Sequence, residues 1–252
     1  MSALGRRHSS PRRRAALATL LVTAVALGGT ACGPFAEQEA GPFKGMTGPQ
    51  ILNKSIAATK TAKSLTLDLA VTSAADGPTK AYLAVDRQGR CAGTMTLGAI
   101  GTAEIIKSGD DAYLRFDEAF LREQGKGESA AQQAAVLKEL KGKWVRTDAS
   151  DPEAKDSLEL CDLDALLAPL EQGVNFATAG GETTVNGRKA LRLTEGDGKE
   201  STTLYVATEG APHLLKIVTK GGEEPGTISL SSYDKPVPAQ KPAAKDVIEM
   251  ED

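Results

Sequence analysis

SLTLDLAVT, residues 64–72, is the stretch of sequence that decides the fold. Leucine or valine occupies every second position, and threonine, aspartate or alanine fills most of the positions between them. Since successive side chains of a strand point to opposite faces, this pattern predicts a strand with one apolar face. The preceding segment, Gln50 to Lys63, carries apolar side chains at helical spacing, and Thr47 and Gln50 are spaced as a capping box. The chain is therefore expected to pass directly from a helix into a strand.

Downstream, the period of two recurs in short segments that glycine-rich turns separate, among them the hairpin signal Asn186-Gly187. Helical patterns are expected at 129–140 and again at 163–170. Strands joined by short turns imply antiparallel pairing. The predicted strands cover residues 80–86, 91–97, 103–107, 112–116, 143–147, 182–185, 189–194, 201–207, 214–219 and 227–232.

Many of these strands have a second face of small, weakly polar residues, as Thr66, Ala70 and Thr72 illustrate. A sheet with two fairly apolar faces is covered on both sides or curls around a ligand or core. Alternatively, solvent bathes the second face, and its threonines reflect strand propensity alone. Both interpretations stay open at this level.

The N-terminus has the three parts of a secretory signal peptide. Residues 1–14 are basic with five arginines, residues 15–27 are apolar and uncharged, and residues 28–31 are small. The apolar part is short for a membrane span, which needs about 20 residues, so cleavage is favoured over an uncleaved anchor. The arginine pairs also permit twin-arginine export, although the usual apolar residues after the pair are missing.

Cys32 is the predicted attachment site of a lipid. Gly29-Thr30-Ala31-Cys32 resembles the bacterial lipobox, in which the cysteine receives a diacylglyceryl group, with palmitate as a typical acyl chain, and becomes the new N-terminus. Gly29 departs from that pattern, and ordinary signal peptidase could also cut after Ala31. The chain has three cysteines, so acylation of Cys32 removes the odd thiol and leaves Cys91 and Cys161 as a pair. The sequence thus predicts a signal peptide at 1–31, a lipidated tether at 32–46, a domain at 47–237 and an acidic tail at 238–252.

Charge and histidine content exclude several classes of function. Residues 1–31 carry five arginines and no acid, so their removal lowers the formal net charge from −3 to about −8, which argues against nucleic acid as a partner. His213 is the only histidine that remains, so neither a Ser-His-Asp triad nor a zinc site is expected. The adjacent acids at 110–111 and 223–224 lie in glycine-rich turns and are interpreted as solvated loop residues. We expect no cofactor, no metal and no catalysis.

The order of elements resembles the LolA-like fold and, within it, the LppX–LprG group of actinobacterial lipoproteins. The resemblance covers most of residues 47–237, and the chain departs from the group in carrying Cys91 and Cys161. It implies an α+β fold, an antiparallel and incompletely closed β-barrel with helices packed on the open side. The matching features are Cys32, the helix that runs into Ser64-Leu65-Thr66-Leu67, Gly109-Asp110-Asp111-Ala112-Tyr113-Leu114, Gly142-Lys143-Trp144-Val145, Val185-Asn186-Gly187, Leu204-Tyr205-Val206, Pro212-His213-Leu214-Leu215 and the final strand of residues 227–237.

The resemblance implies a non-catalytic lipoprotein on the outer face of the cytoplasmic membrane that holds a lipid or glycolipid in a groove. We expect this groove between the sheet and the helix at 163–170. The alternative is a lipoprotein that binds a protein, such as an envelope sensor, and carries no lipid. A continuous apolar cavity favours the first hypothesis, and a core filled by its own side chains favours the second. The expected groove residues are Leu163, Leu166, Leu167, Leu170 and Tyr205.

Cys91 and Cys161 are predicted to form a disulfide, because an exported domain meets an oxidising environment. Cys161 stands at the start of the leucine-rich helix, with Asp162 or Asp164 available as its N-cap. The bond would pin this helix to the sheet, either as a simple staple or as the fixed wall of a groove that opens elsewhere. A reactive thiol at a helix N-terminus is the remaining alternative.

Overall fold

The computed structural model describes residues 42–74, 77–151, 154–155, 158–168, 177–196 and 199–249. The signal peptide, Cys32, most of the tether, Leu170 and the last three residues of the tail lie outside the described residues. Among the described residues, no helix has both the length and the apolar character that crossing a membrane requires.

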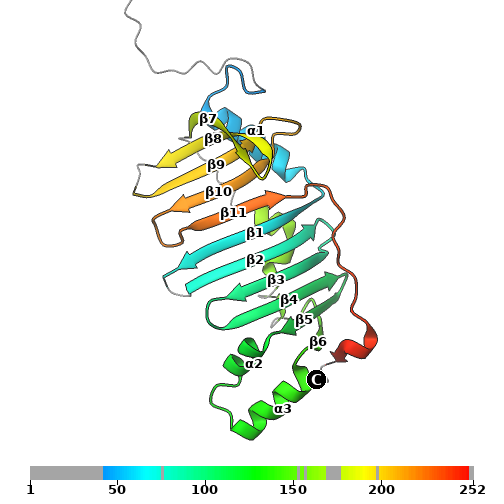
Figure 1. Ribbon diagram of the computed structural model, residues 1–252. Coiled ribbons are helices and arrows are strands. Elements are labelled where there is room, and N and C mark those ends of the chain that lie inside the picture. The colour runs from blue at the N-terminus through cyan, green and yellow to red at the C-terminus, as the bar shows by residue number, and fades with distance from the viewer. Residues whose placement is uncertain are drawn as a thin grey trace, which may run out of the picture. The chain divides into compact units, whose positions relative to one another are not determined.

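A twelve-stranded sheet carries the fold, with the spatial order β12-β6-β5-β4-β3-β2-β1-β11-β10-β9-β8-β7. All neighbouring pairs are antiparallel except β12 with β6, and the end strands β12 and β7 are not paired with each other (Figure 1). The strands are β1 (Ser64–Ser73), β2 (Gly77–Asp86), β3 (Cys91–Leu97), β4 (Gly101–Ser108), β5 (Asp111–Phe116), β6 (Trp144–Asp148), β7 (Thr178–Val185), β8 (Arg188–Gly196), β9 (Ser201–Ala207), β10 (Leu214–Lys220), β11 (Gly226–Ser231) and β12 (Val247–Glu249).

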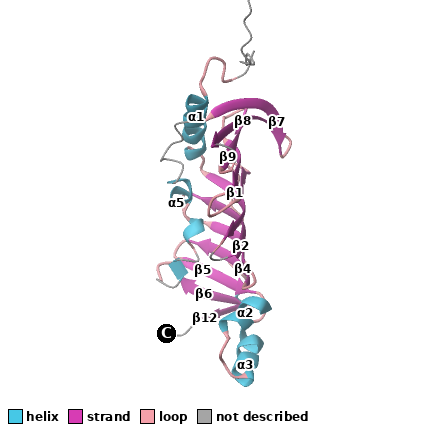
Figure 2. Cartoon of the chain, turned by 90° about the vertical axis from the view of Figure 1, so that its left-hand side faces the viewer, coloured by secondary structure: helices cyan, strands magenta, loops and turns pink. Residues whose placement is uncertain are grey.

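Helices lie on one face of this sheet and at one of its ends. Figure 2 shows α1 (Gly48–Lys60) and α5 (Leu163–Leu167) on the same face, and α2 (Glu118–Gln124) and α3 (Ala130–Leu140) at the end near β12. Two 3-10 turns complete the described elements, η1 (Glu159–Cys161) and η3 (Ala244–Asp246). The predicted α+β class, with an incompletely closed antiparallel sheet and helices on its open side, is confirmed.

The helix that precedes β1 begins where the sequence places it. The Thr47 hydroxyl accepts a hydrogen bond from the Gln50 amide, and the Gln50 side chain accepts one from the Thr47 amide, which completes the capping box. The helix ends at Lys60, three residues before the expected Lys63, because the Thr61 hydroxyl bonds to the Ala58 carbonyl and the chain then turns into β1.

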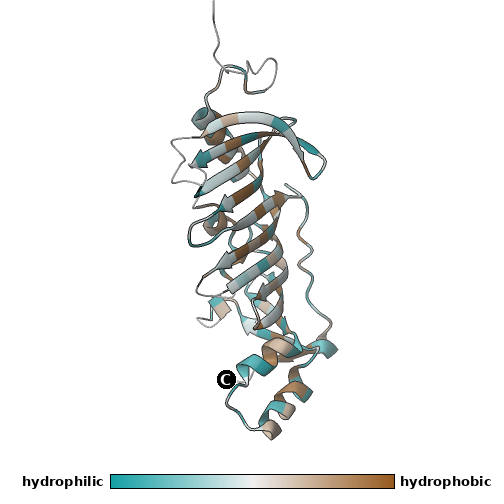
Figure 3. Cartoon of the chain, turned by 60° about the vertical axis from the view of Figure 1, so that its left-hand side comes forward, coloured by the Kyte–Doolittle hydropathy of each residue, from teal (hydrophilic) through white to brown (hydrophobic). Residues whose placement is uncertain are grey.

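The main core lies between the helices and one face of the sheet. β1 contributes Leu65 and Leu67, and β2 contributes Leu83 and Val85, all of them fully buried. Figure 3 shows hydrophobic positions recurring along the strands, with polar positions between them, as a period of two requires. Alternation places the apolar residues of β1 on one face, and this is the face that α1 and α5 cover.

Sequence reasoning missed one α-helix, α2, and one strand, β12. α2 is short and strongly charged, and its Asp117 N-cap accepts a hydrogen bond from the Phe120 amide. In the segment expected to be an acidic tail, β12 pairs in parallel with β6. The chain from β11 to β12 runs along the ends of the strands (Figure 1). Arg146 of β6 holds this segment through Glu249 and through Asp111, which also binds Lys241.

Candidate functional site

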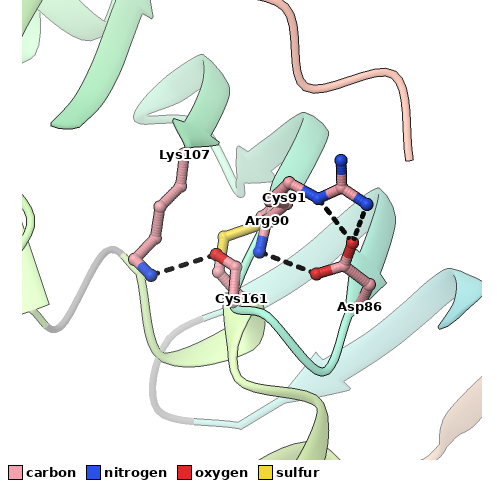
Figure 4. Close-up of a disulfide and its surroundings, with 6 residues drawn as sticks. Asp86, Arg90, Cys91, Lys107 and Cys161 are labelled. Carbon is pink, nitrogen blue, oxygen red and sulfur yellow. Dashed lines mark hydrogen bonds and ion pairs between the residues drawn. A yellow bond between two sulfur atoms is a disulfide. The ribbon is translucent and has the colours of Figure 1, made fainter. Parts of the chain in front are cut away.

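The predicted disulfide joins β3 to the helical segment on the sheet. Cys91 and Cys161 are bonded, their Cα atoms lie 5.3 Å apart, and 70 residues separate them in the chain (Figure 4). Cys161 is the last residue of η1 and lies two residues before the start of α5 at Leu163. The cysteines are 0% and 2% exposed, which buries the sulfur atoms in the main core. Because the two cysteines are bonded to each other, Cys161 is not a free thiol in this structure.

The turn that precedes Cys91 is built around a buried carboxylate. Asp86 is 2% exposed, and its Oδ1 accepts hydrogen bonds of 3.0 Å from the amides of Gln88 and Arg90. The Arg90 guanidinium donates to Oδ2 at 2.7 Å, as Figure 4 shows. Lys107 of β4 donates to the Gly89 carbonyl at 3.0 Å. Because both oxygens of Asp86 accept hydrogen bonds within the turn, this buried carboxylate holds the turn in place.

Arg87 ties three elements together at this end of the sheet. Its Nε donates to the Ala62 carbonyl at 2.8 Å, and its Nη2 donates to the Lys60 carbonyl at the end of α1. Its Nη1 forms an ion pair of 2.5 Å with Asp164 in α5. Arg87 therefore fixes the N-terminal end of α5 relative to α1, in parallel with the disulfide.

α5 packs directly on the sheet. Asp162 caps it, since its Oδ1 accepts hydrogen bonds from the amides of Asp164 and Ala165. Leu163 and Leu167 are 1% and 3% exposed and belong to the main core, and Leu166 is partly buried against that core.

Tyr205 is not brought together with these leucines. It lies in β9 between Leu204 and Val206, which both face the main core. Strand alternation therefore points Tyr205 to the opposite face, where it packs with Ala207 and Leu215 in a small second cluster. Leu170 lies outside the described residues.

A hollow of about 700 Å³ lies between the β2–β3 turn and the η1–α5 segment. Its lining mixes charged residues, including Lys107, Lys155, Glu159 and Asp164, with apolar ones such as Leu158 and Leu163. This hollow does not have the lining expected of an acyl-chain groove, which should be predominantly apolar.

Four half-buried apolar side chains lie in a line across the helix-covered face of the sheet. We call this line the apolar row, and its members are Met95, Leu69, Ile228 and Ile217. Leu69 pairs directly with Ile228, and Ile228 pairs with Ile217. On the other side, Leu69 pairs with Ala81, which pairs with Met95. All four members of the row are only partly buried, although each packs against the main core. The row thus forms the incompletely covered margin of the core.

The opposite face of β1, β2 and β3 is open to solvent along part of its length, although Thr66 on that face is buried. Asp68, Ala70, Tyr82 and Thr94 are all exposed there. Of the two interpretations of the small polar face, the solvent-bathed one therefore describes this part of the sheet.

A polar junction joins α1 to β10. Thr59 Oγ1 accepts a 2.9 Å hydrogen bond from the Leu214 amide, and the Tyr233 hydroxyl donates to the Leu214 carbonyl. Burial is the main cause that raises the pKa of Tyr233. His213 stacks on Tyr233 with 4.0 Å between ring centroids. Burial, with a smaller contribution from Arg188, lowers the pKa of His213, while Asp234 opposes the shift. His213 is thus a neutral packing residue at the entry of a strand.

Sequence reasoning missed Arg87, Met95, Ile217 and Ile228. Met95, Ile217 and Ile228 lie within predicted strands, so alternation could have assigned their face. The contacts of Arg87 with residues 27 and 77 positions away leave no signal in a single sequence.

No family model matches the sequence, and no curated protein matches it. Among solved structures, the chain is similar to LprF from Mycobacterium bovis, with a TM-score of 0.52 and 19% identity, over 78% of this chain and 97% of that one. It is also similar to the Mycobacterium tuberculosis lipoprotein LppX, with a TM-score of 0.46 and 16% identity, over 76% and 99% of the two chains. A LolA superfamily protein from Nitrosomonas europaea matches with a TM-score of 0.25 and 10% identity, over 78% and 98%. The likeness to LprF shows a shared fold, and the resemblance to the LolA-like LppX–LprG group is confirmed at that level.

Proposed function

We propose that this chain is an exported, non-catalytic lipoprotein that holds a hydrophobic ligand, such as the acyl chain of a lipid or glycolipid, against the helix-covered face of its sheet. A diacylglyceryl group on Cys32 anchors it to the outer face of the cytoplasmic membrane. The signal peptide and the small residues before Cys32 support the anchor. Two acyl chains give stable membrane attachment, where a single chain would be marginal.

The apolar row is the observation that carries the ligand-binding part of the proposal. It continues the main core across neighbouring strands from β3 to β10, yet its four large side chains stay partly accessible. Five neighbouring strands span four spacings of about 4.8 Å, or roughly 19 Å, which is long enough for an extended acyl chain. Each methylene that leaves water contributes about 0.8 kcal/mol, so partial cover along this length would already hold a fatty acid.

A fluorescent fatty acid, cis-parinaric acid, tests the site. We expect saturable binding to the mature domain, and Ile228→Asp should weaken it at least about tenfold, because a carboxylate in the row must lose water when the acyl chain covers it. Thr227→Asp is the matched control, since Thr227 is the neighbouring residue of β11 and faces the opposite side. Equal binding by both variants, with both folded by circular dichroism, would reject the apolar row as the site.

Membrane fractionation tests the anchor independently. Cys32→Ser should move the mature protein from the membrane to the soluble extracellular fraction, or leave an unprocessed precursor. Membrane retention with an unchanged mature mass in this variant would reject acylation at Cys32.

One observation favours a protein-binding role as the second candidate. Leu163 and Leu167 are almost completely buried, so α5 fills its own contact with the sheet and leaves those two side chains unavailable to a ligand. If cis-parinaric acid fails to bind a folded and delipidated domain, the scaffold role becomes the better account.

A further inference from the structure

A second hollow lies on the face of the sheet opposite α1 and α5. It has a volume of about 300 Å³ and lies between β1–β3 and the segment that follows β11. Thr66, Ala84 and Ala92 form its floor, and cross-strand pairing places them in one row. Because these three side chains are small, the surface is lower here than on either side.

Flat side chains form the two walls. Tyr82 stands on one side and is 59% exposed, one of the few large hydrophobic side chains that are exposed among the described residues. Pro236 and Pro238 of the segment after β11 also line the hollow. A phenol ring and two pyrrolidine rings around a floor of small residues suit a planar ligand, since aromatic rings gain from stacked contacts.

The proline wall is held in place by contacts outside the hollow. Asp234 accepts a 2.7 Å hydrogen bond from the Lys63 amide, and its own amide donates to the Ser64 carbonyl at 2.9 Å. The Ser64 hydroxyl donates to the Lys235 carbonyl at 2.6 Å. The course of this segment along the strand ends is visible in Figure 1. A wall fixed before the ligand arrives reduces the entropy that binding costs.

Lys235 is the charged residue of the lining, and its ammonium has no carboxylate partner within the described part of the chain. Asp234, its neighbour, already accepts the Lys63 amide. Asp68 lies across from Tyr82 on the neighbouring strand but does not line the hollow, so Lys235 is the charged residue within the lining.

We propose that this hollow binds a small planar aromatic carboxylate, with its ring between Tyr82 and the two prolines and its carboxylate at the Lys235 ammonium. The site lies on the other face from the apolar row and goes beyond the proposed lipid binding. Its occupant is a free small molecule of one or two rings, which suits a volume of about 300 Å³.

Titration with 2-naphthoate, followed by amide chemical shifts of the isotopically labelled mature chain, tests the site. We expect saturable shifts that centre on Tyr82, Ala84 and Ala92. Ala84→Leu should weaken binding about tenfold or more, because the larger side chain fills the floor. Ala70→Leu is the matched control, since Ala70 is an exposed residue of β1 on the same face and does not line the hollow.

Charge and folding are controlled separately. Lys235→Gln should weaken 2-naphthoate about threefold, as expected for an exposed charge pair, and should leave the neutral 2-naphthamide unchanged. If Ala84→Leu lowers the melting temperature, Tyr82→Ala replaces it, because an exposed ring can be removed without opening the core. Ile228→Asp should have no effect on 2-naphthoate, which separates this site from the proposed lipid site. No saturable shift at millimolar ligand, or equal affinity in the wild type, Ala84→Leu and Tyr82→Ala, would overturn the proposal.

Discussion

Opening the disulfide should strongly destabilise the domain. The bond between Cys91 and Cys161 closes a loop of 70 residues. In the chain-entropy treatment, a loop of this length stabilises the folded state by about 4 kcal/mol, because it restricts the unfolded chain. For a domain of about 200 residues, 1 kcal/mol shifts the melting temperature by roughly 2–4 °C, so the expected loss is about 8–16 °C.

Urea unfolding of the mature domain with and without a reductant measures this loss without changing a side chain. With a slope of about 2 kcal/mol/M, the midpoint should fall by about 2 M on reduction. The double variant Cys91→Ala, Cys161→Ala should unfold near the reduced midpoint and should not respond to the reductant. Coincident midpoints for the oxidised, reduced and doubly substituted proteins would refute the reasoning that this bond constrains the unfolded chain.

Three further predictions concern the turn, the polar junction and the C-terminal strand. Asp86→Ala should lower the free energy of unfolding by about 2–4 kcal/mol, because it leaves two amides and the Arg90 guanidinium without their buried acceptor. An unchanged midpoint in urea would contradict the role of this carboxylate. Folding lowers the pKa of His213, so the folded domain favours the neutral imidazole. The stability that depends on this neutral form is complete above the unfolded pKa of about 6.5. It is lost as the pH falls through the lower pKa of the folded state. The pH dependence of the melting temperature below pH 6.5 should therefore be weaker in His213→Phe, and identical slopes would exclude His213 as its source. Deletion of residues 244–252 should change the melting temperature by only a few degrees. It should increase self-association, measured by light scattering, because it exposes the edge of β6. A variant that stays monomeric when it is concentrated would show that β12 does not protect this edge.

Local signals predicted the elements that depend on local chemistry. The capping box at Thr47, the alternation of β1 and the hairpin turn at Asn186-Gly187 all appear where the sequence places them. The cysteine count also led to the pairing of Cys91 with Cys161 that the structure contains. Each of these signals rests on neighbouring residues or on a simple count.

The remaining features depend on contacts that a single sequence does not record. β12 joins the sheet because Arg146 and Asp111 hold residues about 100 to 130 positions away. The expected groove at Leu163 and Leu167 depends on how closely α5 approaches the sheet, and hydrophobic periodicity is the same for a lined groove and a filled core. The resemblance and the weakly polar strand faces place Tyr205 in the expected groove, whereas the alternation of β9 directs it to the face opposite α5.

Native mass spectrometry of the protein extracted from its own membrane in mild detergent tests the central claim most directly. We expect a mature chain that begins at Cys32 and carries the mass of a diacylglyceryl group, together with a noncovalent amphiphile that dissociates on collisional activation. Ile228→Asp should lose the amphiphile and keep the covalent lipid, whereas Thr227→Asp should keep both. A chain without the covalent lipid would contradict the anchor, and a lipidated, folded chain with no bound amphiphile would contradict the carrier function.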